Sequence, residues 1–317
     1  MPAMLLRVRA ITWLAEAING YELVDPNGRD LPRFAAGAHI DLQLSNGLVR
    51  QFSLCNDPAE RRRYCIAVLR DPQSRGGSWH LHDTVRAGDL VEVSMPRNSF
   101  PLAAAAEHHL LLAGGIGIAP IMAMIATLRT RQADFSVHYC TRAPERTAFR
   151  DELFLLTAEG RVRLHHDGGD PARGLDIAAL LREPRAGTHL YYCGPEGMMA
   201  AAKAAAAGWP PDTVHCEYFT PSPEMRRQAA DRPFRVRLAK SGGVYEVPVG
   251  ESIIGVLREH GLRVSTSCEL GYCGACLTRY TAGEPDHRDQ VLEEDGRQRY
   301  VMICCARSKT PVLELDL

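Results

Sequence analysis

The sequence predicts a multidomain chain made of an antiparallel β-barrel, an α/β domain with a parallel sheet, and a smaller α+β domain. Its 317 residues exceed one compact domain of usual size. Short alternating segments separated by turns fill the first hundred residues, and apolar runs alternate with helical patterns in the middle third. Between Pro221 and Pro233 the composition changes to that of a linker. We therefore expect domains at residues 1–102, 103–222 and 234–317, with a linker over residues 223–233.

Composition and charge exclude several classes of protein. The formal net charge of −1 gives no electrostatic basis for binding nucleic acid or an anionic membrane. The first residues lack the apolar core and cleavage site of a secretory signal. The apolar run over residues 110–126 is interrupted by glycines and a proline, which favours a buried strand, a turn and a helix over a membrane span. We expect a cytoplasmic monomer whose ten cysteines stay reduced.

The first domain contains two segments suited to an anionic cofactor with a flat ring. Arg50, Phe52 and Leu54 alternate to one face of a predicted strand, where a ring system could lie and Arg50 could bind phosphate. The segment Gly76-Gly77-Ser78 can form a phosphate cradle, because glycines let backbone N–H groups approach an anion and Ser78 can open a helix. Each segment alone is more often an ordinary strand or turn. Their occurrence together, upstream of a dinucleotide-type segment, favours a cofactor site.

The middle domain is predicted to bind a nucleotide at the carboxyl ends of its strands. Residues 109–113 form a strand, Gly114-Gly115-Ile116-Gly117 a turn, and the following apolar residues a helix through Leu128. The glycine pattern matches the six-residue dinucleotide fingerprint only in part. Strands at residues 135–142 and 189–193 end at the same edge of the sheet, where ligands of parallel sheets bind. Taken singly, such loops are often ordinary connections.

The third domain begins with a predicted hairpin and a capped helix. Strands at 234–238 and 244–249 flank a Gly242-Gly243 turn, and Ser252 can cap a helix over residues 253–260 that Gly261 ends.

A cysteine loop follows this helix. Cys268, Cys273 and Cys276 form a C-x4-C-x2-C run, and Cys304 follows the short apolar run 300–303. This is the spacing of the four thiolates of plant-type [2Fe–2S] clusters. Structural zinc and plain reduced thiols are alternatives, but no second Cys or His knuckle accompanies the run. Cys304 is favoured over Cys305 as fourth ligand because it directly follows the apolar run.

The order of these motifs resembles the phthalate dioxygenase reductase family, and within it most closely the vanillate O-demethylase reductases. The resemblance covers essentially the whole chain and implies an FMN-binding barrel, an NAD-binding domain and a β-grasp-like [2Fe–2S] ferredoxin domain. Two departures are Phe52, where Tyr is more usual, and the additional Cys305. The resemblance implies two sets of cofactor-binding residues: for FMN, Arg50, Phe52, Ser53, Leu54, Gly76, Gly77 and Ser78; for the nicotinamide dinucleotide, Gly115, Ile116, Gly117, Thr141, Arg142, Asp167, Cys193, Gly194, Pro195 and Met198.

The resemblance also implies a reaction, in which NADH reduces FMN and single electrons pass through the cluster to a Rieske-type terminal oxygenase. Ser53 and Phe219, the aromatic expected near the flavin ring, are the catalytic candidates. Arg142, near the expected adenosine ribose, could bind a 2′-phosphate, so NADPH is the alternative coenzyme. An external acceptor is expected because no Rieske Cys-His pairing or His-His-carboxylate set is visible. Alternative acceptors are a cytochrome P450 or a free ferredoxin, and a non-enzymatic redox-sensing module is a third possibility.

Overall fold

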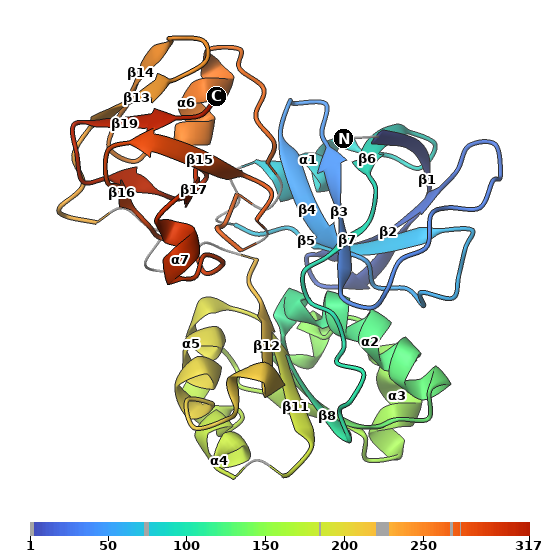
Figure 1. Cartoon of the computed structure of the whole chain (residues 1–317). Helices are drawn as coiled ribbons and strands as arrows, with labels where there is room; N and C mark the ends of the chain where they lie inside the picture. The colour runs from blue at the N-terminus through green and yellow to red at the C-terminus, as the bar shows by residue number, and fades with distance from the viewer. Residues whose placement is uncertain (1–2, 73–75, 184, 220–227, 267–268, 273) are drawn as a thin grey trace. The chain divides into compact units, whose positions relative to one another are not determined.

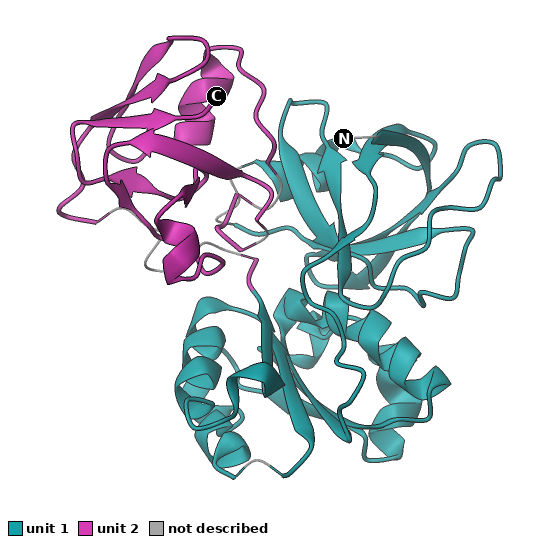
Figure 2. Ribbon diagram, in the orientation of Figure 1, with its two compact units in different colours: residues 1–217 teal, residues 218–317 magenta. Residues whose placement is uncertain are grey.

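The computed structural model describes residues 3–72, 76–183, 185–219, 228–266, 269–272 and 274–317. The chain divides into two compact units, Met1–Glu217 and Tyr218–Leu317 (Figure 2). The first unit holds an antiparallel sheet followed by a parallel sheet, and the second holds a mixed sheet (Figure 1). The predicted fold class is therefore confirmed.

The first sheet is an antiparallel barrel. Its elements are β1 (Ala3–Ala15), β2 (Ile18–Val24), β3 (Ala38–Gln43), β4 (Val49–Ser53), β5 (Tyr64–Leu69), α1 (Gly77–Thr84), β6 (Leu90–Ser94) and β7 (Arg97–Asn98). The strand order is β4-β3-β6-β1-β2-β5, with β7 paired to β3. An antiparallel bridge between Leu54 and Ile66 joins the two ends of this order, so the sheet closes on itself. Both residues are fully buried in the barrel core.

Helix α1 begins differently from the prediction. Its N-cap is Gly76, in a left-handed conformation with φ 89°, and Gly77 is the first helical residue. A residue without a Cβ adopts this conformation at little cost, so the glycine, and not a serine, takes the cap position. Ser78 lies inside the helix, where its hydroxyl accepts a hydrogen bond from the backbone N–H of Asp71 at 3.4 Å. The expectation that Ser78 opens the helix was wrong.

The second sheet is five-stranded and parallel, with the order β10-β9-β8-β11-β12. Helices α2 and α3 lie on one side of it and α4 and α5 on the other (Figure 1). The core under α2 and α3 includes Leu111, Val137 and Tyr191, each without exposed surface. The elements are β8 (His108–Gly114), η1 (Gly115–Gly117), α2 (Ile118–Thr130), β9 (Asp134–Thr141), η2 (Pro144–Arg146), α3 (Arg150–Ala158), β10 (Val162–His166), η3 (Pro171–Arg173), α4 (Ile177–Leu181), β11 (Thr188–Cys193), α5 (Glu196–Ala205), η4 (Pro211–Thr213) and β12 (Val214–Glu217).

The second unit is built on a five-stranded sheet of order β14-β13-β19-β15-β17, with β13 and β19 parallel. Ser252 caps helix α6 by accepting a hydrogen bond from Gly255 N–H at 3.0 Å, as predicted. The elements are β13 (Phe234–Leu238), β14 (Val244–Val247), α6 (Ile253–Glu259), β15 (Leu277–Ala282), β16 (Pro285–Asp286), α7 (Glu294–Arg297), β17 (Tyr300–Met302), β18 (Arg307–Ser308) and β19 (Val312–Leu315).

Two buried arginines bind the chain that precedes β13 to the body of this unit. Arg288 contacts Asp231 at 2.5 Å and Asp286 at 2.6 Å, and the side chains of Arg288 and Asp231 are about 5 % exposed. Arg307 donates to the carbonyl oxygens of Arg232 and Glu251, at 2.8 and 2.7 Å. These contacts satisfy charges that would be costly to bury alone.

Candidate functional site

The glycine loop after β8 lies directly against the loop after β11. A Cβ on Gly117 would lie 2.1 Å from the carbonyl oxygen of Cys193, and one on Gly114 would lie 2.6 Å from Pro195. The two loops can approach this closely only because both glycines lack a side chain. Met198 packs at the same place, with its Sδ 2.7 Å from the Cβ position of Gly114. The predicted sets Gly115-Ile116-Gly117 and Cys193-Gly194-Pro195-Met198 are thus brought together at one edge of the sheet.

The neighbouring strands β9 and β10 contribute the remaining residues of this edge. Asp167 N–H donates to the Thr141 carbonyl oxygen at 3.2 Å, and Gly168 N–H donates to that of Arg142 at 2.9 Å. The Asp167 carboxylate accepts a hydrogen bond from Gly169 N–H at 2.7 Å, which orients it within the loop. Thr141, Arg142 and Asp167, which the family resemblance selected, are therefore close in space.

On the barrel, Arg50 lies over the start of helix α1. A Cβ on Gly77 would lie 2.5 Å from Arg50 Nε, so only a glycine admits the guanidinium here. This places the arginine beside the backbone of Gly76 and Gly77, a combination of charge and helix N-terminus that suits a phosphate. Phe52 packs against the barrel core from a partly exposed position, and Leu54 is fully buried.

The Ser53 side chain contacts the parallel sheet at Glu217, a residue that the sequence analysis did not select. Its hydroxyl donates to the carboxylate of Glu217, the last residue of β12, at 3.0 Å. Burial raises the pKa of Glu217 to about 7, although the hydrogen bond from Ser53 opposes the shift. Cys193 is the partner of Glu217 in the adjacent strand. Burial, reinforced by the charge of Glu217, raises the pKa of the Cys193 thiol well above its usual range, so Cys193 is a neutral packing residue.

The signal that could have identified Glu217 is its position. It ends a strand of the parallel sheet and stands two residues before Phe219, which was selected. Phe219 belongs to the second unit, where 36 % of its surface is exposed. An exposed aromatic ring of this kind can cover a planar ligand.

Two of the four predicted cluster ligands lie within the described residues. Cys276 and Cys304 are 4 % and 7 % exposed, and their side chains interact with one another. The Cys305 side chain interacts with Cys304 and also contacts the Met302 carbonyl oxygen at 3.6 Å, so of these two cysteines Cys304 is the one with a recorded contact to Cys276. Cys268 and Cys273 lie outside the described residues, and among those described no group of three His, Cys, Asp or Glu side chains could hold a metal.

The loop around these cysteines has a backbone suited to wrapping a cluster. Gly271 and Gly274 have φ values of 73° and 76°, a region that other residues adopt at a cost. Buried thiols on a tightly turned, glycine-containing loop fit an iron–sulfur cluster, because thiolates bind iron and loop N–H groups can point at sulfur.

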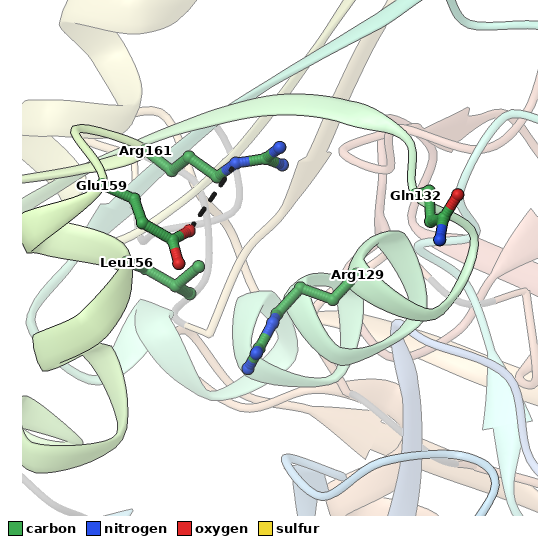
Figure 3. Close-up of a pocket in the computed structure, with 5 residues that line it drawn as sticks. All are labelled: Arg129, Gln132, Leu156, Glu159 and Arg161. Carbon is green, nitrogen blue, oxygen red and sulfur yellow. Dashed lines mark ion pairs between the residues drawn. The ribbon is translucent and has the colours of Figure 1, made fainter.

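A pocket of about 200 Å³ lies elsewhere, at the end of the sheet where β10 begins. It is lined by Arg129, Gln132, Leu156, Glu159 and Arg161, and Figure 3 shows the ion pair between Glu159 and Arg161, 3.9 Å long. These residues come from the C-terminal ends of α2 and α3 and from the amino end of β10. The pocket is therefore remote from the glycine loops and belongs to a different edge of the sheet.

Comparison with family models finds two matches. Residues 236–309 match the 2Fe-2S iron–sulfur cluster binding domain, and residues 93–214 match the N-terminal domain of dimethylamine monooxygenase subunit DmmA-like proteins. The first match covers most of the second unit and includes Cys268, Cys273, Cys276 and Cys304. No helix among the described residues is long and apolar enough to cross a membrane.

Full-length relatives extend this result. The reductase subunit of the tert-butanol monooxygenase / tert-amyl alcohol desaturase of Aquincola tertiaricarbonis is 49 % identical, over 99 % of this chain and 96 % of the relative. A vanillate O-demethylase oxidoreductase of Pseudomonas putida is 46 % identical, over 96 % of each chain. The solved structure of phthalate dioxygenase reductase, described as modular for electron transfer from pyridine nucleotides to [2Fe-2S], superposes with a TM-score of 0.80 at 42 % identity, covering 99 % of this chain and 98 % of that one.

Fold and site together define a reductase with a flavin-type barrel, a pyridine-nucleotide domain and its own [2Fe–2S] domain. It is an oxidoreductase of the class that serves oxygenases. The chain belongs to the phthalate dioxygenase reductase family, which confirms the resemblance found in the sequence.

Proposed function

We propose that the protein transfers electrons from NADH, through FMN and a [2Fe–2S] cluster, to the Rieske-type oxygenase component of an aromatic O-demethylase or ring dioxygenase. The observation that carries this proposal is the Ser53–Glu217 hydrogen bond, which joins the end of a barrel strand to the end of a nucleotide-domain strand. A flavin held on the barrel and a nicotinamide held on the sheet would meet at such a junction. The relatives described above are reductase subunits of oxygenase systems, which supports the acceptor class.

The barrel residues would hold the flavin. Arg50, at the N-terminus of α1, would bind the phosphate, and Phe52 and Ser53 would lie along the ring. FMN is proposed over FAD on the strength of the family resemblance. Flavin, when bound, exchanges electrons in pairs with nicotinamide and singly with an iron–sulfur cluster, which neither of those groups can do alone.

At the junction, Ser53 and Glu217 hold a proton in a defined place. With a pKa of about 7, Glu217 is protonated in a large fraction of molecules near neutral pH, and its carboxyl group can keep or release that proton beside the Ser53 hydroxyl. Cys193, whose thiol stays neutral, fills the adjacent space without acting as a nucleophile. Phe219 would exclude water from the reacting rings.

NADH is proposed over NADPH because a carboxylate stands where the adenosine ribose is expected. Asp167 is held by its loop beside Arg142. A carboxylate accepts a hydrogen bond from a ribose 2′-hydroxyl and repels a 2′-phosphate, whereas an arginine attracts the 2′-phosphate. We expect kcat/KM for NADH to exceed that for NADPH, and Asp167→Ala to narrow the difference. An equal or reversed preference in the native protein would contradict this assignment.

The cluster would be held by Cys268, Cys273, Cys276 and Cys304. We also propose domains at residues 1–102, 103–222 and 234–317, with a linker at 223–233, in a monomeric cytoplasmic protein. Thiolate ligation in preference to disulfide formation is the rule in a reducing compartment.

The deciding experiment is an anaerobic titration of the purified protein with NADH, followed by visible absorbance and low-temperature EPR, with cofactor release at the end. We expect loss of flavin absorbance, the EPR signal of a reduced [2Fe–2S] cluster, and FMN in the released fraction. A Cys304→Ser variant provides the control, since it should bleach the flavin without the cluster signal. A native protein that stays fully oxidised with NADH would refute the electron route.

A further inference from the structure

The cysteine loop of the second unit is anchored from several sides. Glu269 forms an ion pair with Arg258 of α6 and accepts a hydrogen bond from the Thr266 hydroxyl at 3.3 Å. The Gly271 carbonyl oxygen accepts a hydrogen bond from Gln290 N–H at 3.1 Å. These anchors tie the loop to the domain that carries it.

A further contact comes from a distant part of the chain. The rings of Tyr218 and Tyr272 stack with a centroid separation of 4.6 Å and an interplanar angle of 3°. Both residues belong to the second unit and both are half-buried. This separation and angle are typical of a stacked aromatic pair.

Each of the two tyrosines is next in sequence to a residue of a candidate site. Tyr218 follows Glu217, whose carboxylate accepts the hydrogen bond from Ser53, and it precedes Phe219. Tyr272 precedes Cys273 and lies four residues before Cys276. The stack therefore connects the residue next to the Ser53–Glu217 junction with the residue next to a predicted cluster ligand.

We propose that Tyr218 and Tyr272 are positioning residues for electron transfer, and that their ring stack holds the cysteine loop against the segment of the second unit that carries Tyr218 and Phe219. This inference rests on the proposed function. In the proposed function, NADH would supply two electrons as hydride and the cluster would accept them one at a time, so that each NADH oxidised would account for two one-electron reductions of the acceptor. A cysteine loop that loses this anchor is held less firmly, so the step into the cluster slows, while hydride transfer, which does not involve the loop, is unaffected.

The test uses Tyr272→Ala, Tyr218→Ala and the corresponding phenylalanine variants, each as full-length holoprotein. In anaerobic stopped-flow measurements with NADH, we expect flavin reduction within twofold of wild type in the alanine variants and cluster reduction at least tenfold slower. Phenylalanine keeps the stacked ring and should restore the rate to within twofold. Because the two rings act through each other, the double alanine variant should be no slower than the slower single variant.

A second readout is independent of turnover. Backbone hydrogen exchange over residues 269–276, measured without NADH, should be faster in both alanine variants than in wild type and unchanged in the phenylalanine variants. Tyr245→Ala is the matched control, because it removes a ring from another aromatic pair of the same unit, Tyr245–His260, and should change neither measurement.

The outcomes separate this inference from the proposed function. If wild type transfers electrons to its cluster and both alanine variants do so at the wild-type rate with unchanged exchange, the positioning role is wrong and the proposed function stands. If wild type reduces its flavin but never its cluster, the proposed function itself fails. Slow cluster reduction that phenylalanine does not rescue would also overturn the role of the stack.

Discussion

The buried carboxyl of Glu217 makes stability depend on pH in a direction opposite to that of most carboxylates. Its pKa rises from 4.5 to about 7 on folding, chiefly through burial. A raised pKa means that the folded state prefers the protonated form. The contribution of Glu217 is therefore most favourable below about pH 4.5, declines as pH rises to about 7, and stays at its lower value above that.

The perturbation that tests this is Glu217→Gln, which keeps a side-chain oxygen for Ser53 and removes the charge. At about 1.4 kcal/mol per pKa unit, the shift from 4.5 to about 7 corresponds to about 3 kcal/mol, reduced somewhat because the residue keeps some exposed surface. For a unit of 217 residues, about 1 kcal/mol moves the melting temperature by about 2–4 °C. We expect the Gln variant to gain about 4–10 °C on wild type between pH 4.5 and pH 8.

The assay is scanning calorimetry of both proteins across that pH range, taking the difference between variant and wild type at each pH. Other titrating groups cancel in this difference, because both proteins contain them. Glu92→Gln, which changes an exposed residue of β6, is the control and should give a constant difference. A constant difference for Glu217→Gln would refute the reasoning, as would one that falls with pH.

Two further predictions concern the cluster and the glycine loop. Cys304→Ser should abolish the EPR signal of the reduced cluster and Cys305→Ser should preserve it, because the Cys304 side chain interacts with that of Cys276, another predicted ligand; the reverse pattern would mean that Cys305 is the fourth ligand. Gly117→Ala should destabilise the protein by about 1–3 kcal/mol in chemical denaturation, since its Cβ would meet a backbone oxygen at 2.1 Å, whereas Gly208→Ala meets nothing within 4 Å and should change stability by less than about 1 kcal/mol. Similar effects at both glycines would show that the close approach is unimportant.

The parts of this protein that could be predicted from sequence are those set by local pattern. The run from His109 to Leu128 predicted strand, glycine turn and helix, and the structure has β8, η1 and α2 there. Ser252 was correctly assigned as a helix cap because capping depends on residues a few positions away.

Features that depend on distant residues could not be predicted in the same way. Ser53 and Glu217 are 164 positions apart, and Glu217 acquires its raised pKa only when the barrel and the parallel sheet bury it. The start of α1 was mistaken because the left-handed conformation of Gly76 cannot be read from a Gly-Gly-Ser triplet, which is compatible with several turns.

The two buried arginines of the second unit define where its ferredoxin module can be cut. A fragment that began at Phe234 would lack Asp231 and leave the buried Arg288 with one carboxylate partner, Asp286, in place of two. It would also lack Arg232, whose carbonyl oxygen accepts from Arg307. A transplantable version of this module therefore has to include Asp231 and Arg232. A chimaera joined at Phe234, where β13 begins, would contain a destabilised module.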